Sequence, residues 1–237
     1  MDYSLFNNCY ISEFVGCGKL DTIALTIANI DNSIHEYMKL PKDIHALGVI
    51  SSRTGAAGQI MAVDEAIKMT SAKLITVELP RDTKGWGGHG NYIVMGAKTY
   101  SDVKQATELA LSLCDKHAGE VYISEAGHLE FCYTASCGAA INKVFGAPIG
   151  SAFGFMAASP AAIGLLLADK AVKSASIQPL DLWTPNHGTS HSNEVILPFT
   201  GSASDVKNAV LTARELGMKV LTAMGSTPLS PSEPYIL

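Results

Sequence analysis

The pattern of apolar and polar positions along the chain predicts the same series of helices and strands twice. Within each series, apolar residues recur at three- and four-residue spacing, which predicts an amphipathic helix because such residues share one face. These faces comprise Ile60, Val63, Ile67 and Thr70 in the first series and Leu165, Ala168, Val172 and Ala175 in the second. Short apolar runs around each helix predict strands at 46–50, 74–79 and 92–95, and at 152–156, 179–183 and 195–199.

Each series ends in a second helix with the same spacing of apolar residues. Ser101 precedes one of these patterns and Ser204 precedes the other. A serine in this place can accept a hydrogen bond from a backbone N–H that the first helical turn leaves unpaired. We therefore predict that each of these helices is capped by its serine.

The two series are copies of one unit. "DEAIKMTSA" begins at Asp64 and "DKAVKSASI" begins at Asp169, 105 residues later, whereas "SDVKQA" returns as "SDVKNA" after 103 residues. Units of this length have the size of small domains. The sequence predicts two tandem α+β domains, residues 1–117 and 118–237, each an antiparallel sheet with helices on one side.

Composition narrows the class of protein. Of the 237 residues, 47% are apolar and 16% are charged, so the chain can bury a core and is not expected to be disordered. A net charge of −5 argues against a nucleic-acid partner. The first residues show no basic and apolar leader, and no apolar run is long enough for a membrane span, so we expect neither. Five cysteines without a CxxC spacing predict reduced thiols in a cytoplasm.

The repeated helix motif, the loop between two strands and the "SDVK" helix together resemble the bacterial microcompartment shell domain. Across the chain, "RTGAAGQIMAVDEAIK", "ELPRDTKG", "GHG", "EAGH" and the "HGTS" and "SNE" segments are similar to tandem-domain shell proteins of the PduB/EtuB type. The resemblance extends from about Phe14 to Ile236. It implies two circularly permuted, ferredoxin-like shell domains in each chain.

The resemblance also implies a role. Three chains would form a homotrimer with pseudo-sixfold symmetry, a pseudohexamer that tiles the facets of a microcompartment shell within the cytoplasm. Pores would pass small polyols, alcohols or amines and hold back aldehyde intermediates. Other shell proteins, enclosed enzymes and metabolites would be the partners, and no enzymatic activity, catalytic residue, cofactor or metal is expected. The enclosed pathway is left open among propanediol, ethanol, ethanolamine, choline and glycerol.

The loop "RDTKGWGGHGN" lies between two predicted strands, whereas a phosphate-binding loop leads into a helix N-terminus. In the shell fold this loop points at the ring axis, where glycine relieves crowding because it lacks Cβ. The resemblance therefore implies pore-lining residues in both copies, namely Lys84, Gly85, Trp86, Gly87, Gly88, His89, Gly90, His187, Gly188, Thr189, Ser190, His191 and Ser192. An ordinary surface loop is the alternative, and Trp86 departs from the family pattern.

Two lysines repeat with the helix motif. Lys68 and Lys173 follow the edge lysine of the family, which bonds to backbone carbonyls of the adjacent ring. The resemblance implies that both stand at the edge of the tile. A solvated lysine on a helix face is the alternative.

Two histidines and two cysteines suggest other chemistry. His187 and His191 have the i, i+4 spacing of a metal-binding pair on a helix, but Gly188 between them predicts a loop. A nucleophilic role for Cys132 or Cys137 would require a base that the sequence does not identify. Buried, inert thiols are the alternative.

Glu125, His128 and Glu130 lie close together in the sequence and could support acid–base chemistry. Hydrogen bonds at the start of a domain or at an interface are the plainer interpretation. Two other classes of protein therefore remain as alternatives: an enzyme on a duplicated α+β fold, and a regulatory module that binds a small molecule.

Overall fold

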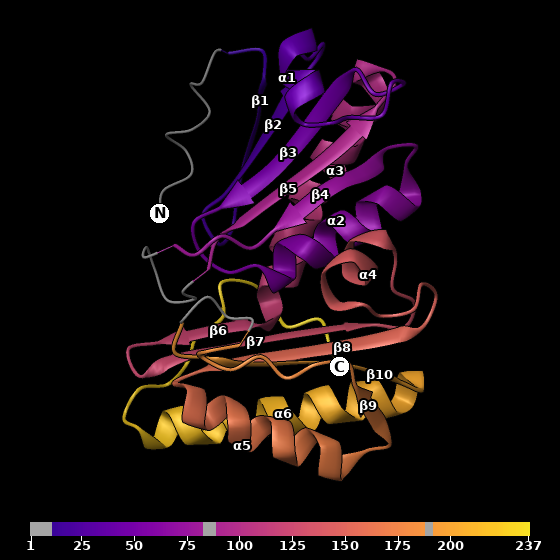
Figure 1. Cartoon of the computed structure of the whole chain (residues 1–237). Coiled ribbons are helices and arrows are strands. Elements are labelled where there is room, and N and C mark those ends of the chain that lie inside the picture. Colours follow the sequence, from indigo (N-terminus) through magenta and orange to yellow (C-terminus); the bar gives the residue numbers. More distant parts are fainter. Residues whose placement is uncertain (1–10, 83–88, 188–191) are drawn as a thin grey trace.

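In this computed structural model, the strands form two five-stranded sheets (Figure 1). The structure describes residues 11–82, 89–187 and 192–237. The first sheet has the order β1-β2-β3-β5-β4 and the second the order β6-β7-β8-β10-β9. Every neighbouring pair of strands is antiparallel. The strand bounds are Phe14–Gly18 (β1), Thr22–Ile27 (β2), Ala46–Ser52 (β3), Lys73–Glu78 (β4), Asn91–Ala97 (β5), Val121–Ser124 (β6), Gly127–Thr134 (β7), Ala152–Ser159 (β8), Ile177–Pro179 (β9) and Val195–Gly201 (β10).

The identical strand order confirms the predicted duplication and the α+β class. We call residues 11–117 the first half and residues 118–237 the second half. A one-turn 3₁₀ helix, η2 (Ala118–Glu120), leads from the first half into β6.

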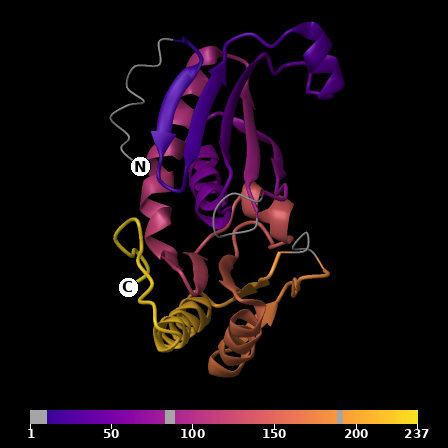
Figure 2. The same ribbon diagram turned by 90° about the vertical axis from the view of Figure 1, so that its left-hand side faces the viewer.

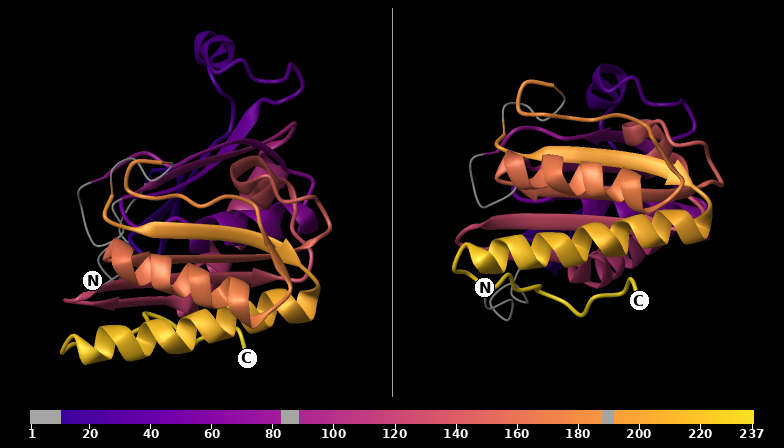
Figure 3. Two further views of the ribbon diagram at one scale, coloured as in Figure 1. Left: turned by 60° about the horizontal axis from the view of Figure 1, so that its bottom comes forward. Right: turned by 90° about the horizontal axis from the view of Figure 1, so that it is seen from below.

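Two long helices pack together on each sheet, as the apolar spacing predicted. α2 (Ala57–Met69) and α3 (Tyr100–His117) cover the first sheet. α5 (Ala161–Ser174) and α6 (Ala203–Ala223) lie side by side on the outer face of the second sheet (Figure 3). No helix in the described ranges is both long enough and apolar enough to cross a membrane.

The second sheet is covered on both of its faces. Met156 and Ala158 of β8 join the core with α5 and α6, whereas Phe155 and Ala157 join the core that contains α2. α4 (Ala139–Phe145) also lies between the two sheets, beside α2 (Figure 1). The expectation of helices on one side only was therefore incomplete.

Two short helices escaped prediction. α4 and its counterpart in the first half, α1 (Asn32–Tyr37), follow the second strand of their sheets. With seven and six residues, each is too short to show a full helical repeat of apolar positions.

The predicted N-caps need correction by two residues. α3 is capped by Thr99 and α6 by Ser202, whose side chains accept from the backbone N–H groups of Asp102 and Asp205. Each aspartate in turn accepts a hydrogen bond from the capping hydroxyl, at 2.6 and 2.7 Å. The predicted caps, Ser101 and Ser204, lie inside the first turn instead.

The strand predicted at 179–183 is also wrong in its bounds. β9 ends at Pro179. The backbone N–H of Leu180 still donates to the carbonyl of Pro198, and mutual pairing with β10 resumes at Trp183, whose backbone exchanges two hydrogen bonds with Ile196. Pro198 lies opposite Leu180 and cannot return a hydrogen bond to it, because proline lacks a backbone N–H. The missing donor explains why this edge is irregular.

The C-terminal segment ties the two halves together along the end of α3 (Figure 2). Within the second half, buried Glu120 holds this segment: it accepts hydrogen bonds from the backbone N–H groups of Tyr235 and Ile236, and it pairs with Arg214 at 2.9 Å. Nζ of Lys19, in the first half, donates to Ser232. These donors compensate for the cost of burying the charge of the Glu120 carboxylate.

Candidate functional site

The sequence predicts that two loops line a pore, and the structure describes only the ends of these loops. Nine of the predicted residues lie outside the described ranges: Lys84, Gly85, Trp86, Gly87, Gly88, Gly188, Thr189, Ser190 and His191. The described members are His89 and Gly90 at the end of the first loop and His187 and Ser192 at the ends of the second. Their contacts show where the described ends of the two loops lie.

Glu194 brings the bases of the two loops together. Nδ1 of His89 lies 2.6 Å from Oε1 of Glu194, and the hydroxyl of Ser192 donates to the same oxygen at 2.7 Å. From β7, Nε2 of His128 lies 3.3 Å from Oε2 of Glu194. Both histidines and the carboxylate are buried. His89, predicted to line an opening, therefore directs its imidazole into the contact between the halves of this chain.

Glu130 completes what we call the junction cluster, which consists of His89, His128, Glu130 and Glu194. Burial raises the pKa of Glu130 to about 7, and the charge of Glu194 adds to this shift while His128 and His89 oppose it. Burial also opposes ionisation of Glu194, but hydrogen bonds and positive charge from His128 and His89 outweigh it and lower that pKa to about 2. The cluster thus holds one permanent carboxylate and one carboxyl group that titrates near neutral pH.

A cavity of about 20 Å³ adjoins the junction cluster. Its polar wall is formed by His89, Glu130 and Glu194, and apolar side chains close the rest, chiefly Ile60, Leu79, Phe145, Phe155 and Trp183. A space of this size holds one water molecule. None of the described residues that line it is a serine, cysteine or lysine. The site can bind and release a proton, but it is too small for a metabolite.

The proposed acid–base group does not assemble as a unit. His128 and Glu130 point into the contact between the halves, whereas Glu125 is exposed in the turn between β6 and β7. The cysteines are unsuited to nucleophilic attack. Burial raises the pKa of the Cys132 thiol well above its ordinary value, and the buried Cys137 thiol donates to the carbonyl of Pro148 at 2.9 Å.

His187 lies in an exposed turn. Its backbone exchanges two hydrogen bonds with Thr184, and its Nε2 lies 3.5 Å from Oδ1 of Asp181. His191, its predicted metal-binding partner, is outside the described residues. Across the described parts of the chain, no group of three or more histidine, cysteine, aspartate or glutamate side chains is placed to hold a metal ion.

Gly90 shows why the first loop needs glycine at its base. A Cβ at this position would lie 2.5 Å from the carbonyl oxygen of Ser52, which is closer than atoms can approach. The backbone N–H of Gly90 donates to Pro80 at 2.9 Å, and Arg53 makes a two-pronged ion pair with Asp82 beside it. Close approach of two backbone segments explains this glycine.

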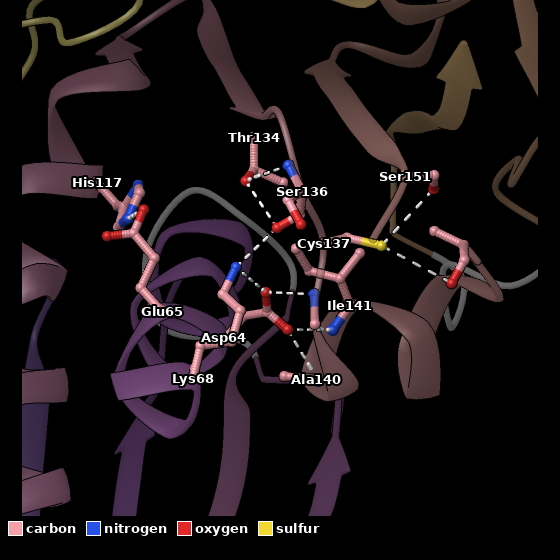
Figure 4. A network of polar contacts seen from close by, with 12 residues as sticks. Asp64, Glu65, Lys68, His117, Thr134, Ser136, Cys137, Ala140, Ile141 and Ser151 are labelled. Atoms are coloured by element: carbon pink, nitrogen blue, oxygen red, sulfur yellow. Dashed lines mark hydrogen bonds and ion pairs between the residues drawn. The ribbon is translucent and has the colours of Figure 1, made fainter. Parts of the chain in front are cut away.

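The repeated helix motif forms a second polar contact between the halves (Figure 4). Asp64 on α2 is buried, and its carboxylate accepts from the backbone N–H groups of Gly138, Ala140 and Ile141 at 2.7 to 3.2 Å. Gly138 precedes α4 and has no side chain to cap that helix. Asp64 therefore caps α4 from the other half of the protein.

The two predicted edge lysines have different surroundings within the chain. Nζ of Lys68 lies 3.0 Å from Asp64 and donates to the carbonyl of Ser136 at 2.8 Å, so it bridges the halves. Among the residues that the structure describes, Lys173 pairs with exposed Asp169, at 2.7 Å, and its own side chain is also exposed. Lys68 and Lys173 occupy equivalent positions in the repeat, but in the part of the chain that the structure describes Lys68 contacts the other half and Lys173 does not.

Sequence reasoning missed Glu194 and Asp64 as contacts between the halves. Glu194 stands directly before the apolar run 195–199, and a charged residue bordering a buried strand was the available signal. Asp64 belongs to the repeated motif, but nothing local distinguishes it from exposed Asp169. Only the packing of one half on the other separates the two.

Comparison with known proteins gives consistent matches. The family model described as the BMC domain matches residues 152–229. The chain is 46% identical over 229 residues to bacterial microcompartment shell protein PduB of Citrobacter freundii, covering 97% of this chain and 85% of that one. It is 42% identical over 227 residues to the protein of the same name from Limosilactobacillus reuteri, covering 95% of each chain.

Solved structures agree with these relatives. EtuB from Clostridium kluyveri superposes with a TM-score of 0.91 at 43% identity, covering 95% of this chain and 99% of that one. A trimeric bacterial microcompartment shell protein PduB superposes with a TM-score of 0.90 at 42% identity, covering 95% of this chain and all of the other.

Proposed function

The chain belongs to the bacterial microcompartment shell proteins of the PduB family, and we propose on this basis that it forms a trimeric tile with a metabolite pore at its centre. As a shell protein it is a structural component and not an enzyme, and its place is the microcompartment shell within the cytoplasm. The finer proposals concern how the tile is built, what lines the pore and what stands at the edge.

The duplicated fold supports the trimer. Residues 1–117 and 118–237 are proposed as two shell domains, and their sheets have the same strand order. Three chains then supply six similar units around one axis. A structure of 42% identity is a trimeric bacterial microcompartment shell protein, which supports the proposed trimer.

One observation carries the pore proposal: His89 and Ser192, at the bases of the two predicted loops, both contact Glu194. The described ends of the two loops, at His89 and Ser192, therefore lie beside each other. In a ring, six such loops would converge on the axis and line an opening. Since the two loops differ in sequence, the chemistry of the opening would be threefold, with passage for small hydroxylated or amine solutes and retention of aldehydes.

A bulky residue at Gly88 is expected to reduce the flux of the polar metabolite into intact compartments severalfold, because six loops share the space at the axis. Gly88→Trp would be compared with Ser112→Trp, which places the same side chain on the exposed face of α3. Uptake of labelled substrate by purified compartments gives the measurement. Equal flux in the two variants would show that these loops do not line the pore.

Lys173 is proposed as an edge residue, together with Lys68. We expect Lys173→Ala to leave trimers intact but to prevent their association into sheets, as seen by native mass measurement and electron microscopy. Lys219→Ala is the matched control, because Lys219 also forms an exposed i, i+4 pair, with Glu215 on α6. Sheets formed as readily by Lys173→Ala as by the control would exclude the edge role.

A further inference from the structure

The first turn of α2 depends on a carboxyl group from the other half of the chain. Ala56 precedes this helix and makes no side-chain hydrogen bond that would cap it. The backbone N–H of Ala57 instead hydrogen-bonds to the carboxyl group of Glu130 on β7. The second copy differs, because Asn193 of the same half accepts a hydrogen bond from Ala161 at the start of α5, at 3.2 Å. A group that can gain or lose a proton therefore links the halves at α2.

The carboxyl group of Glu130 also borders the cavity between the halves. This cavity of about 20 Å³ has room for one water molecule. The first half supplies Ile60 and Leu79 to its wall, and the second half supplies Phe155 and Trp183. Because its walls belong to both halves, widening the cavity separates the halves at this point.

The groups around Glu130 compensate its charged form poorly. Three titratable side chains face it, namely His128 on the same strand, His89 at the end of the first loop and Glu194 before β10. The neighbouring strands pair Glu130 with Val121 and Ala157, which carry no charge. Both histidines already contact the Glu194 carboxylate, at 2.6 and 3.3 Å. A second carboxylate beside apolar walls must therefore draw its solvation from water.

The charged side chains of α2 contact other elements. Asp64 caps α4, and Lys68 lies 3.0 Å from Asp64. Glu65 lies 3.1 Å from His117 on α3. α2 therefore faces Glu130 with the backbone N–H of its first turn and not with a charged side chain.

We propose that the junction cluster is a proton-controlled latch between the halves: with Glu130 protonated the halves close on one water molecule, and loss of that proton admits more water and parts them at the cavity. In this step the O–H bond of the carboxyl group breaks, and the proton passes to water or to a buffer base. By strand register the first sheet has Ile23 in this place, since Ile23 pairs with Ser51 as Glu130 pairs with Ala157. The latch thus lies at the junction within one chain, and it goes beyond the proposed tile without depending on it.

The latch opens toward alkaline pH. Burial raises the pKa of Glu130 to about 7, from an ordinary value of 4.5. The stability that the protonated carboxyl group gives to the closed junction is therefore complete below about pH 4.5 and is lost as pH rises through about 7. Glu194, whose pKa is about 2, stays charged throughout this range and cannot set the midpoint.

Trp183 can report on the latch because it lines the cavity. Trp86→Phe leaves it as the single tryptophan of the chain. In this background we expect quenching of the fluorescence by acrylamide to rise severalfold from pH 6 to pH 8.5, with a midpoint near 7. With Glu130→Gln added, quenching should stay at the low value throughout. The matched control is Glu125→Gln, which alters an exposed glutamate of the turn between β6 and β7 and should keep the transition.

A histidine near Trp183 requires its own control. Asp181 accepts a hydrogen bond from the indole N–H of Trp183 at 2.6 Å, and Nε2 of His187 lies 3.5 Å from the same carboxylate. His187→Asn in the Trp86→Phe background should keep the transition. Loss of the transition in that variant would assign the signal to the exposed turn and overturn the latch.

Hydrogen exchange tests the same opening in the unmodified protein. After correction for the intrinsic pH dependence of exchange, the amides of the first turn of α2 should exchange severalfold faster at pH 8.5 than at pH 6. Unchanged exchange there, flat quenching in Trp86→Phe, or a transition that survives Glu130→Gln would each overturn the latch. Native mass measurement at both pH values separates these results from the proposed tile, which fails instead if the wild-type chain forms no trimer.

Discussion

Replacing Asp64 with alanine is expected to lower the free energy of unfolding by about 3 to 5 kcal/mol, the range typical of removing one partner from a buried charged contact. The carboxylate accepts from three backbone N–H groups at the start of α4. Without it, these donors lose their acceptor in a buried setting, and Lys68 loses its ion partner. The contact between the halves should weaken first, because α4 is held there.

The comparison that tests this expectation is Lys68→Ala. Lys68 is partly exposed, and without it Asp64 keeps its three backbone N–H donors, so removal of Lys68 should cost only about 1 kcal/mol or less. Asp64→Asn, which keeps one carbonyl acceptor, should fall between the two. Urea unfolding at fixed protein concentration gives the three values. Equal losses for Asp64→Ala and Lys68→Ala would show that the ion pair, and not the cap, provides the stability.

The sequence predicted the four long helices and the strands next to them, because these elements carry complete periodic patterns. The duplication strengthened each assignment, since two independent copies showed the same spacing. The sequence did not predict β1, β2, β6 and β7, which lie where the two copies differ most in sequence, nor α1 and α4, which are shorter than two full turns. It also placed the strand at 179–183 where β9 spans Ile177–Pro179, and Pro198 on the paired strand cannot donate to the ladder.

The candidate site was predictable only in part. His128 and Glu130 drew attention by their spacing, and His89 by its place in the glycine-rich loop. Their common partner, Glu194, lies more than sixty residues further along the chain and is reached only through folding. The sequence also could not predict that Asp64 is buried and Asp169 exposed. The repeat makes the two residues alike in sequence, but Asp64 alone of the two faces the other half.

Replacing Glu130 with glutamine is expected to remove a pH dependence of stability. Glu130 has a pKa of about 7 in the folded protein and an ordinary pKa near 4.5 in the unfolded chain. As pH rises, the unfolded chain therefore loses this proton before the folded protein does, and the unfolded state gains stability. The free energy of unfolding should therefore fall between about pH 4.5 and 7, by about 3 kcal/mol, and stay low above that. Glu130→Gln should match wild type near pH 5 and exceed it at pH 8.

Glu194→Gln should lower the free energy of unfolding near neutral pH, where Glu130→Gln should raise it. The two variants together therefore test the junction cluster as a unit. Its carboxylate has a pKa of about 2, so it contributes stability above about pH 4.5 that is lost only as pH falls toward 2. Removing this buried partner of two histidines should cost about 3 to 5 kcal/mol at neutral pH. It also removes a charge that raises the pKa of Glu130, so stability between pH 5 and 8 should vary less. Denaturant unfolding at pH 5, 6.5 and 8 resolves both effects, and parallel pH profiles for wild type and both variants would mean that Glu130 does not titrate in this range.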